Sequence, residues 1–313
     1  MAKKSKRGSG PRPGSNRAER VAARKLRQAQ SAAPAARPFD GLAAECDLVA
    51  LRAFVASATV AITPAGDGVG TNAVSLATIL PGAVQALTRE NGDVVEGLVA
   101  LQTEFNAADV PGEIAAALRW ASNAAAGAPY TQQTDDDVLD TSSGTDDLVA
   151  TVGADTVLDI TTHEDFSWWF APGAQLSPEI EAMVAQASES IMPTARLQAD
   201  LGGAPWWVDA GERAHIRWVR GESEDDVMTA LARLHAAGKL TMGDGSRFAG
   251  SFRTHGLLVP VFDLDNERHH EEWVGPAQRF EADLLEALAQ TGELTAEQRR
   301  SRDGIRSRQV TLR

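Results

Sequence analysis

Three side chains near residue 250 are of types that bind anions. Arg247, Arg253 and His255 lie just before the apolar run 256–264, and all three have odd numbers. Because side chains alternate between the two faces of a strand, an extended chain here puts the three on one face. Guanidinium groups beside an imidazole suit a phosphate or carboxylate, so we predict a ligand pocket of a small-ligand binder or enzyme. The alternative is that both arginines pair with acidic groups of the protein.

A second polar group follows the same run. Residues 263–273, DLDNERHHEEW, contain carboxylates and imidazoles, which are suitable ligands for divalent metals. The adjacent His269 and His270 point in different directions on either a helix or a strand, and the spacing HExxH is absent. We therefore interpret 263–273 as a solvated loop and predict no metal site.

The glycines and the single cysteine also exclude familiar chemistry. Gly66, Gly68 and Gly70 do not have the GxGxxG spacing that opens the helix of a dinucleotide-binding unit, so we predict no cofactor. Cys46 is the one cysteine, which excludes an intramolecular disulfide and a cysteine zinc cluster.

The strongest remaining signal is electrostatic. Residues 1–30 hold ten Lys or Arg and one acid, a net charge of +9, and the whole chain has −13, so residues 31–313 carry −22. If residues 16–29 become helical, four arginines at steps of +3, +4 and +3 lie along one face. They are Arg17, Arg20, Arg24 and Arg27.

This basic arm predicts contact with a phosphate backbone. Arginine matches phosphate geometry, and the arm has no aromatic residue, so it would contact RNA or a ribonucleoprotein without reading sequence. The alternatives are that the arm docks on the acidic remainder of the chain, that it is a solvated tail, or that it contacts lipid. The charge of the arm alone does not distinguish among these alternatives and RNA contact.

Two tryptophan pairs stand out in a chain with 5% aromatic residues: Trp168–Trp169 and Trp206–Trp207. On a strand, each pair would place one ring inside and one ring outside. An exposed ring could stack on a partner, which keeps a protein–protein adaptor open as a third function. The simpler interpretation is core packing together with a partner or inter-domain interface.

The elements that would position these residues divide the chain into four parts. Residues 1–38 have almost no large apolar side chains, so we expect a disordered basic arm and linker. Residues 39–127 and 156–313 each contain hairpin strands followed by helices, and the second part ends in a basic segment. The Asp- and Thr-rich stretch 128–155 reads as an acidic linker loop. The predicted fold class is α+β, with two halves that contain mixed or antiparallel sheets.

Local signals support individual elements. Asn91-Gly92 between two apolar stretches predicts a β-hairpin. Ser177 before Pro178 and Ser223 before three acids predict helix starts, whereas Pro260 inside the run 256–264 predicts an edge strand.

The N-terminus and the apolar stretches indicate where in the cell the protein is located. No apolar run follows the basic start, which argues against a secretion signal. Residues 69–88 are uncharged, but Pro81 and several polar side chains argue against a membrane span. With a single cysteine, these features predict a cytoplasmic protein without a membrane span.

Several segments resemble a known family. RFAGSFRTHGLLVPVFDL (247–264) and LTAEQRRSRDGIRSRQVTLR (294–313) resemble actinobacterial cytoplasmic proteins of unknown function, and residues 39–60 and 230–240 also fit. The resemblance covers most of residues 39–313 and implies a single unit with no established activity.

Relatives in that family sometimes carry the labels topoisomerase or preprotein translocase ATPase. The chain has no GxxxxGK[ST] loop for an ATPase. Its one tyrosine, Tyr130, precedes an acidic stretch that would repel a phosphate. Both labels therefore conflict with the chemistry of this sequence.

These observations favour a non-enzymatic, macromolecule-binding protein whose arm contacts RNA or a ribonucleoprotein. A ligand site or enzyme near Arg247, Arg253 and His255 is the second hypothesis, and a protein–protein adaptor is the third.

Overall fold

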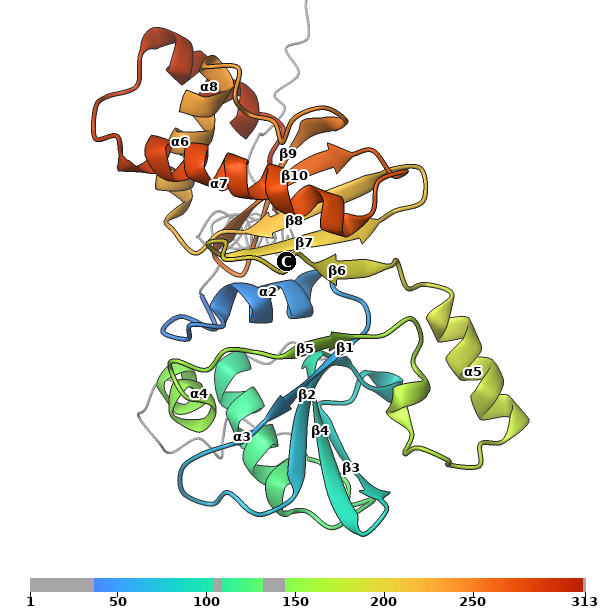
Figure 1. The fold of residues 1–313 in the computed structure, drawn as a ribbon. Coiled ribbons are helices and arrows are strands. Elements are labelled where there is room, and N and C mark those ends of the chain that lie inside the picture. Colours follow the sequence, from blue (N-terminus) through green and yellow to red (C-terminus); the bar gives the residue numbers. More distant parts are fainter. Residues whose placement is uncertain (1–36, 104–108, 132–143, 312–313) are drawn as a thin grey trace, which may run out of the picture. The chain divides into compact units, whose positions relative to one another are not determined.

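The computed structural model describes residues 37–103, 109–131 and 144–311 (Figure 1). The predicted basic arm, with Arg17, Arg20, Arg24 and Arg27, lies outside the described residues. The described chain contains two sheets and helices of both halves, so the fold class is α+β, as the sequence predicts.

The first sheet, sheet A, has five strands in the order β3-β4-β2-β1-β5. Strands β2 and β4 pair in parallel and the other neighbours are antiparallel, so the sheet is mixed. The hairpin predicted at Asn91-Gly92 joins β3 and β4. Asn91 pairs with Val94, so Gly92 and Asp93 form the turn, and Gly92 has φ +64°. The strands are β1 Ala58–Ile62, β2 Ala73–Ile79, β3 Ala86–Asn91, β4 Val94–Gln102 and β5 Ile160–Thr162.

One face of sheet A is covered by helices α2 (Glu45–Ala53) and α3 (Val110–Asn123). Gly97 of β4 allows α3 to approach closely, because a Cβ atom there would lie 2.7 Å from Ala121. Helix α4 (Gly144–Val152) packs beside α3, within the stretch that we interpret as an acidic linker. The short helix η1 (Pro81–Ala83) links β2 to β3.

The second sheet, sheet B, has six strands in the order β11-β9-β10-β8-β7-β6, all antiparallel except the β11–β9 pair. Pro260 lies in β10, between β9 and β8, so the prediction of an edge strand is wrong. The β8–β10 ladder covers Val261–Leu264 and resumes only at the Leu258–Arg220 bridge, which leaves Pro260 unpaired on that side. The strands are β6 Thr194–Arg196, β7 Ala204–Asp209, β8 Ala214–Val219, β9 Ser246–Thr254, β10 Leu257–Leu264 and β11 Val310–Thr311.

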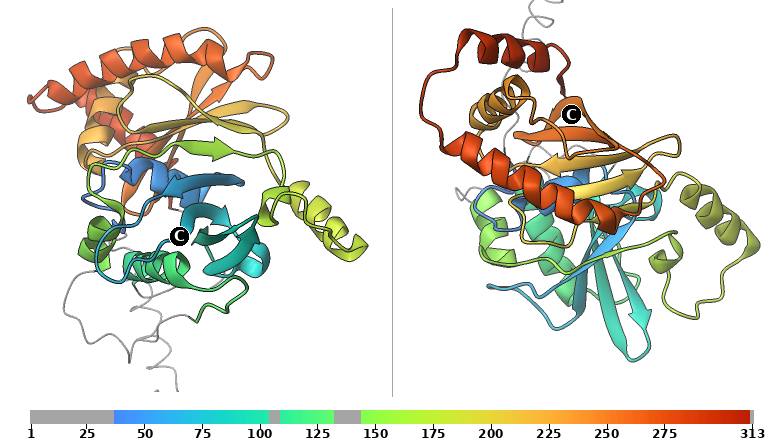
Figure 2. Two further views of the ribbon diagram at one scale, coloured as in Figure 1. Left: turned by 60° about the horizontal axis from the view of Figure 1, so that its bottom comes forward. Right: turned by 45° about the horizontal axis from the view of Figure 1, so that its top comes forward.

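Helices α6 and α7 cover one face of sheet B, and α8 packs against α6 (Figure 2). The predicted starts at Ser177 and Ser223 are confirmed, because the Ser177 hydroxyl accepts from Ile180 N and the Ser223 hydroxyl from Asp226 N. The remaining elements are η3 Ser167–Trp169, α5 Pro178–Ser188, α6 Glu224–Ala236, η4 His270–Trp273, α7 Val274–Ala289 and α8 Ala296–Arg306.

Helix α2 lies between the two sheets (Figure 1). Residues 48–51 are four consecutive buried positions, which no single helix face can contain, so the helix is covered on opposite sides. Its apolar side chains share one core with Val99 of β4 and with Trp206 and Val219 of sheet B. We call this cluster the shared core. The assignment of 39–127 and 156–313 as separate halves stays a prediction.

Candidate anion-binding site beside helix α2

Arg52 occupies the C-terminal turn of α2, where the helix dipole favours a cation. Its Nε donates to Nε2 of His255 at 3.0 Å, and its Nη1 donates to the carbonyl oxygen of Leu101. Among the described residues, no carboxylate lies within ion-pair distance. Burial lowers the pKa of Arg52, as expected for a cation without a paired anion.

Arg217 is a second arginine without an acidic partner. It lies in β8 between the buried Ile216 and Trp218, so its side chain points to the opposite face, toward α2. The guanidinium carbon lies 5.4 Å from the ring centroid of Phe54, which directly follows α2. The structure shows no hydrogen bond or ion pair from Arg217 to any described residue, and burial lowers its pKa.

Trp206, like Arg217, provides a donor without an acceptor among the described residues. It pairs with Arg217 across the β7–β8 ladder, so both side chains lie on the same face of sheet B. Trp206 is 0% exposed, yet its indole Nε1 has no hydrogen-bond partner within the described part of the chain. A buried donor without an acceptor costs about 1–3 kcal/mol of stability. An acceptor on this face of sheet B would remove that cost.

His255 lies at the turn between β9 and β10, where it contacts Arg52. Its φ of +48° is unusual for a residue other than glycine, and its ring stacks on Phe39 with centroids 6.5 Å apart. Nδ1 lies 2.8 Å from the Thr254 hydroxyl, so the ring bridges Thr254 and Arg52. Burial and the charge of Arg52 lower the pKa of His255 to about 4, which keeps the imidazole neutral at pH 7.

The pKa of His255 predicts how stability depends on pH. The unfolded chain, with an imidazole pKa near 6.5, binds a proton between pH 6.5 and 4 that the folded chain does not. The free energy of unfolding should therefore fall as the pH is lowered through that interval, by up to about 3 kcal/mol.

We expect His255→Asn to flatten this pH dependence, because asparagine tolerates positive φ but does not titrate. Urea unfolding at pH 7, 5.5 and 4.5 measures the difference between the two proteins. If the free energy of unfolding falls equally with pH in the native chain and in the variant, other groups cause the loss of stability.

The structure separates the two predicted arginines of the pocket. Arg247 pairs with Asp263 across β9 and β10, whereas Arg253 lies opposite Leu258 and pairs with Glu224 of α6. A bulge between the two positions shifts the register by one residue, so the two arginines lie on opposite faces of sheet B. Odd numbering along β9 therefore does not place them together.

Both arginines have the acidic partners that the alternative interpretation predicts. Asp263 accepts from Arg247 and lies 3.4 Å from Arg213 Nη1 and 3.2 Å from His215 Nδ1. Of the three predicted pocket residues, only His255 contacts Arg52. Sequence reasoning did not find Arg52, Arg217 and Trp206 as a group. One signal was available in the sequence. Arg217 lies between two apolar residues of a strand with alternating pattern, which places its charge on the opposite face from them.

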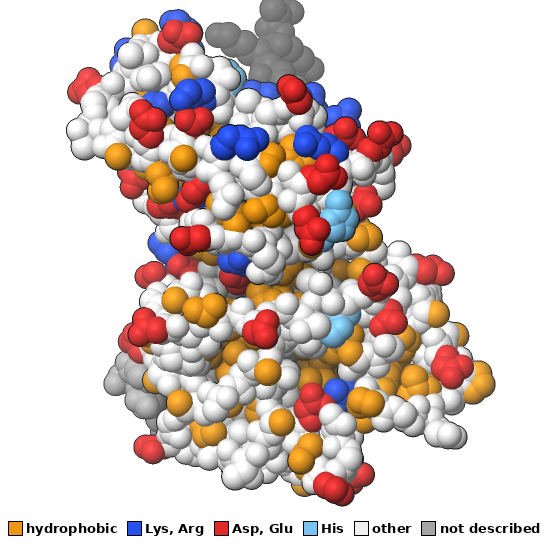
Figure 3. All heavy atoms as spheres, in the orientation of Figure 1, with side chains coloured by type: hydrophobic (Ala, Val, Ile, Leu, Met, Phe, Trp, Pro, Cys, Tyr) orange, Lys and Arg blue, Asp and Glu red, His pale blue; other side chains and the backbone are white. Residues whose placement is uncertain are grey.

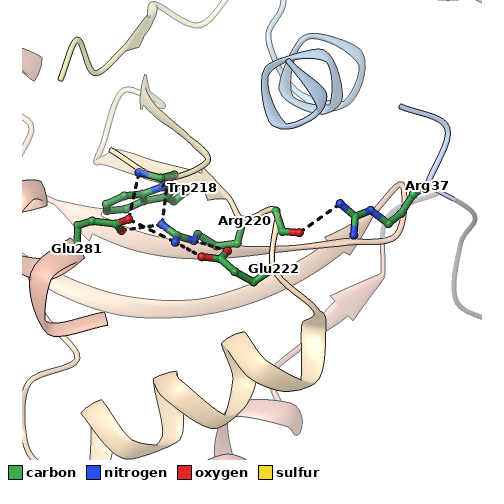
Figure 4. A network of polar contacts seen from close by, with 7 residues as sticks. Arg37, Trp218, Arg220, Glu222 and Glu281 are labelled. Atoms are coloured by element: carbon green, nitrogen blue, oxygen red, sulfur yellow. Dashed lines mark hydrogen bonds and ion pairs between the residues drawn. The ribbon is translucent and has the colours of Figure 1, made fainter. Parts of the chain in front are cut away.

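A separate ionic network lies beside α2, and Arg220, 1% exposed, is its centre (Figure 4). Arg220 Nη1 donates to Glu281 Oε2 at 2.7 Å and to the Gly202 carbonyl oxygen at 2.9 Å, and its Nε donates to Glu222 Oε2 at 3.0 Å. Burial alone would lower the pKa of Arg220, but Glu222 and Glu281 raise it above its ordinary value. Because the charge of Arg220 is fully paired, we assign this network a structural role.

Arg37 joins the start of the described chain to the same region. It pairs with Glu45 of α2. It also donates to the Gly221 carbonyl oxygen at 3.2 Å (Figure 4). Cys46 lies close to Gly221, and burial raises its pKa to about 12, so its thiol is a poor nucleophile.

The aromatic residues singled out in the sequence are mostly buried. Trp206 and Trp207 lie on opposite faces of β7, as strand alternation predicts. Trp168 and Trp169 lie instead in the short helix η3, where Trp169 is buried and Trp168 is half-buried.

Tyr130 does not have the environment of a nucleophile. Its hydroxyl donates to Glu113 at 2.8 Å, and burial raises its pKa.

Within residues 37–103, 109–131 and 144–311, no group of three His, Cys, Asp or Glu side chains is placed to hold a metal ion. No helix in this part of the chain is long and apolar enough to cross a membrane.

Comparison with known proteins identifies the family. No curated protein and no solved structure matches the chain. A family model described as a family of unknown function (DUF5926) matches residues 38–313, which include every residue of the candidate site. The chain therefore belongs to this family of unknown function.

Proposed function

We propose that the protein binds a small phosphate-bearing ligand beside α2, through Arg217 and with Trp206 and Arg52 as further donors. The observation that carries the proposal is the Arg217 guanidinium, which is half-buried and has no acceptor among the described residues. A charge in such a place is costly unless an anion compensates it. Buried titratable groups without partners are a recognised mark of functional sites.

The chemistry of the donors favours phosphate. A guanidinium can donate two parallel hydrogen bonds to an oxyanion, and the indole N–H of Trp206 adds a third donor on the same face. His255 is neutral at pH 7, so it accepts from Arg52 and adds no charge of its own. The proposal concerns binding and assigns no catalytic step.

Arg217→Met should abolish this binding without unfolding the protein. The substitution removes the donors but retains the apolar contact with Phe54, and it leaves no carboxylate unpaired. We expect pyrophosphate to raise the melting temperature of the native chain at constant ionic strength. Titration calorimetry should show at least about tenfold weaker binding to the variant.

Arg247→Met is the matched control, because Arg247 lies on the same sheet and is 71% exposed. It should bind pyrophosphate like the native chain. Trp206→Phe should also weaken binding, because it removes the indole N–H donor. Equal affinities of the Arg217 and Arg247 variants would refute the site.

A second candidate function is contact with RNA or a ribonucleoprotein through the basic arm, and it would place the protein in the cytoplasm. The net charge of +9 in residues 1–30 supports it. Replacing Arg17, Arg20, Arg24 and Arg27 with glutamine should remove most of the RNA affinity. For the native chain, log affinity should fall with log salt, with a slope of about −0.7 per phosphate contacted.

The control replaces Lys3, Lys4, Lys6 and Arg7, which carry the same total charge without the one-face spacing. Filter binding to a single-stranded RNA measures both variants. If the control loses as much affinity as the test variant, the arm acts through charge alone. Salt-independent binding would exclude phosphate contact.

A further inference from the structure

Helix α5 (Pro178–Ser188) buries none of its side chains. Only Val184 and Ala187 of the helix, with the following Ile191, pack at the edge of a small cluster on sheet A around Phe166 and Trp169. A helix of eleven residues is only marginally stable without tertiary packing. The surface of α5 therefore lacks the packing that ordinarily stabilises so short a helix.

The surroundings of α5 are apolar. Met183 is 42% exposed, and Met192, just beyond the helix, is also exposed. Trp168 and Phe170 lie half-buried at the same cluster. Figure 3 shows hydrophobic side chains gathered over sheet A and beside α5. We call Met183, Val184, Ile191, Met192, Trp168 and Phe170 the α5 surface. Flexible methionines and half-buried aromatic rings are typical of surfaces that bind helices.

The charge of this region defines the chemistry of a partner. Residues 160–195, which include η3 and α5, contain five Asp and Glu and no Lys or Arg. Glu179, Glu181 and Glu189 are exposed on and next to α5. Arg89, which donates to the Trp168 carbonyl oxygen, is paired with Glu96 at 2.7 Å.

These charges argue against a second copy of the chain as the partner. Two copies would bring the same acidic region against itself, and like charges placed together oppose association. A basic partner would gain from the same charges.

We propose that the α5 surface binds an amphipathic helix with basic flanks from a partner protein. The apolar face of that helix would cover Met183, Val184 and Ile191, and its Lys or Arg side chains would face Glu179, Glu181 and Glu189. The proposal is independent of the anion site beside α2.

The probe is a 14-residue peptide of leucine and lysine with leucines at helical spacing, labelled for fluorescence anisotropy. We expect it to bind the full chain, with weaker binding at higher salt. We expect a peptide of the same composition in scrambled order, and one with glutamate in place of lysine, not to bind. Hydrogen exchange of the α5 amides should slow when the basic peptide is bound.

Met183→Ser should weaken binding of the peptide at least about fivefold, because it removes an exposed apolar contact of the α5 surface. Leu285→Ser is the matched control, since Leu285 of α7 is an apolar residue elsewhere that is at least as exposed as Met183. Glu181→Gln combined with Glu189→Gln should reduce the salt dependence. The arm variant with four glutamines should bind the peptide as tightly as the native chain or more tightly.

Equal losses for Met183→Ser and Leu285→Ser would overturn the proposal, as would equal binding of the glutamate peptide. Self-association of the native chain that Met183→Ser abolishes would assign the surface to a second copy and would also overturn it.

Discussion

Glu281→Ala should lower the free energy of unfolding by about 3–5 kcal/mol. Glu281 of α7 accepts from Arg220 and from the backbone N–H of Gly202, so the substitution removes a charge partner and an acceptor together. The Arg220 guanidinium, 1% exposed, would keep Glu222 as its remaining partner. Leaving a buried charge incompletely paired costs more than the pair itself contributes to stability.

A double variant separates the cost of an incompletely paired charge from the contribution of the ion pair itself. Arg220→Met with Glu281→Leu removes both charges and fills a similar volume, so it should be less destabilised than Glu281→Ala alone. Urea unfolding of the native chain and of the single and double variants measures the coupling. If Glu281→Ala changes stability by less than about 1 kcal/mol, the network does not contribute as its geometry indicates.

Leu48→Ala should cost about 2–5 kcal/mol, the usual range for removing a buried leucine side chain. Leu48 is fully buried in α2, in the core that contains residues of both sheets. We therefore expect both sheets to lose stability together. Calorimetry should show one transition in the native chain and one, at lower temperature, in the variant.

The control for this prediction is Leu284→Ala, which removes a fully buried leucine from the core between α7 and sheet B. If each half unfolds on its own, the two substitutions would affect different transitions. Two separate transitions, of which Leu48→Ala shifts only one, would contradict the assignment of a core common to both sheets.

Local features of the fold were predictable from the sequence. The Asn91-Gly92 turn, the caps at Ser177 and Ser223, and the alternation at Trp206–Trp207 depend on a few neighbouring residues, and all are present. Such features are visible in a sequence because their physical causes are local.

The predictions that fail concern features that depend on residues distant in the sequence. Whether the strand with Pro260 is central depends on pairing with β8, some 40 residues earlier in the chain. The faces of Arg247 and Arg253 depend on one bulge, which reverses every side chain beyond it. The grouping of Arg52 with His255 requires contact between residues 203 positions apart, which alternation and helical spacing do not encode.

The position of α2 also has a consequence for synthesis of the chain. Helix α2 packs against β7 and β8, which begin more than 150 residues after it and are therefore made later. At about 5–20 residues per second, ribosomes need roughly 8–30 s to add that length. During this interval Leu48, Val49 and Leu51 lack their sheet B partners. The nascent chain therefore presents an apolar helix that a chaperone can bind until β7 and β8 emerge.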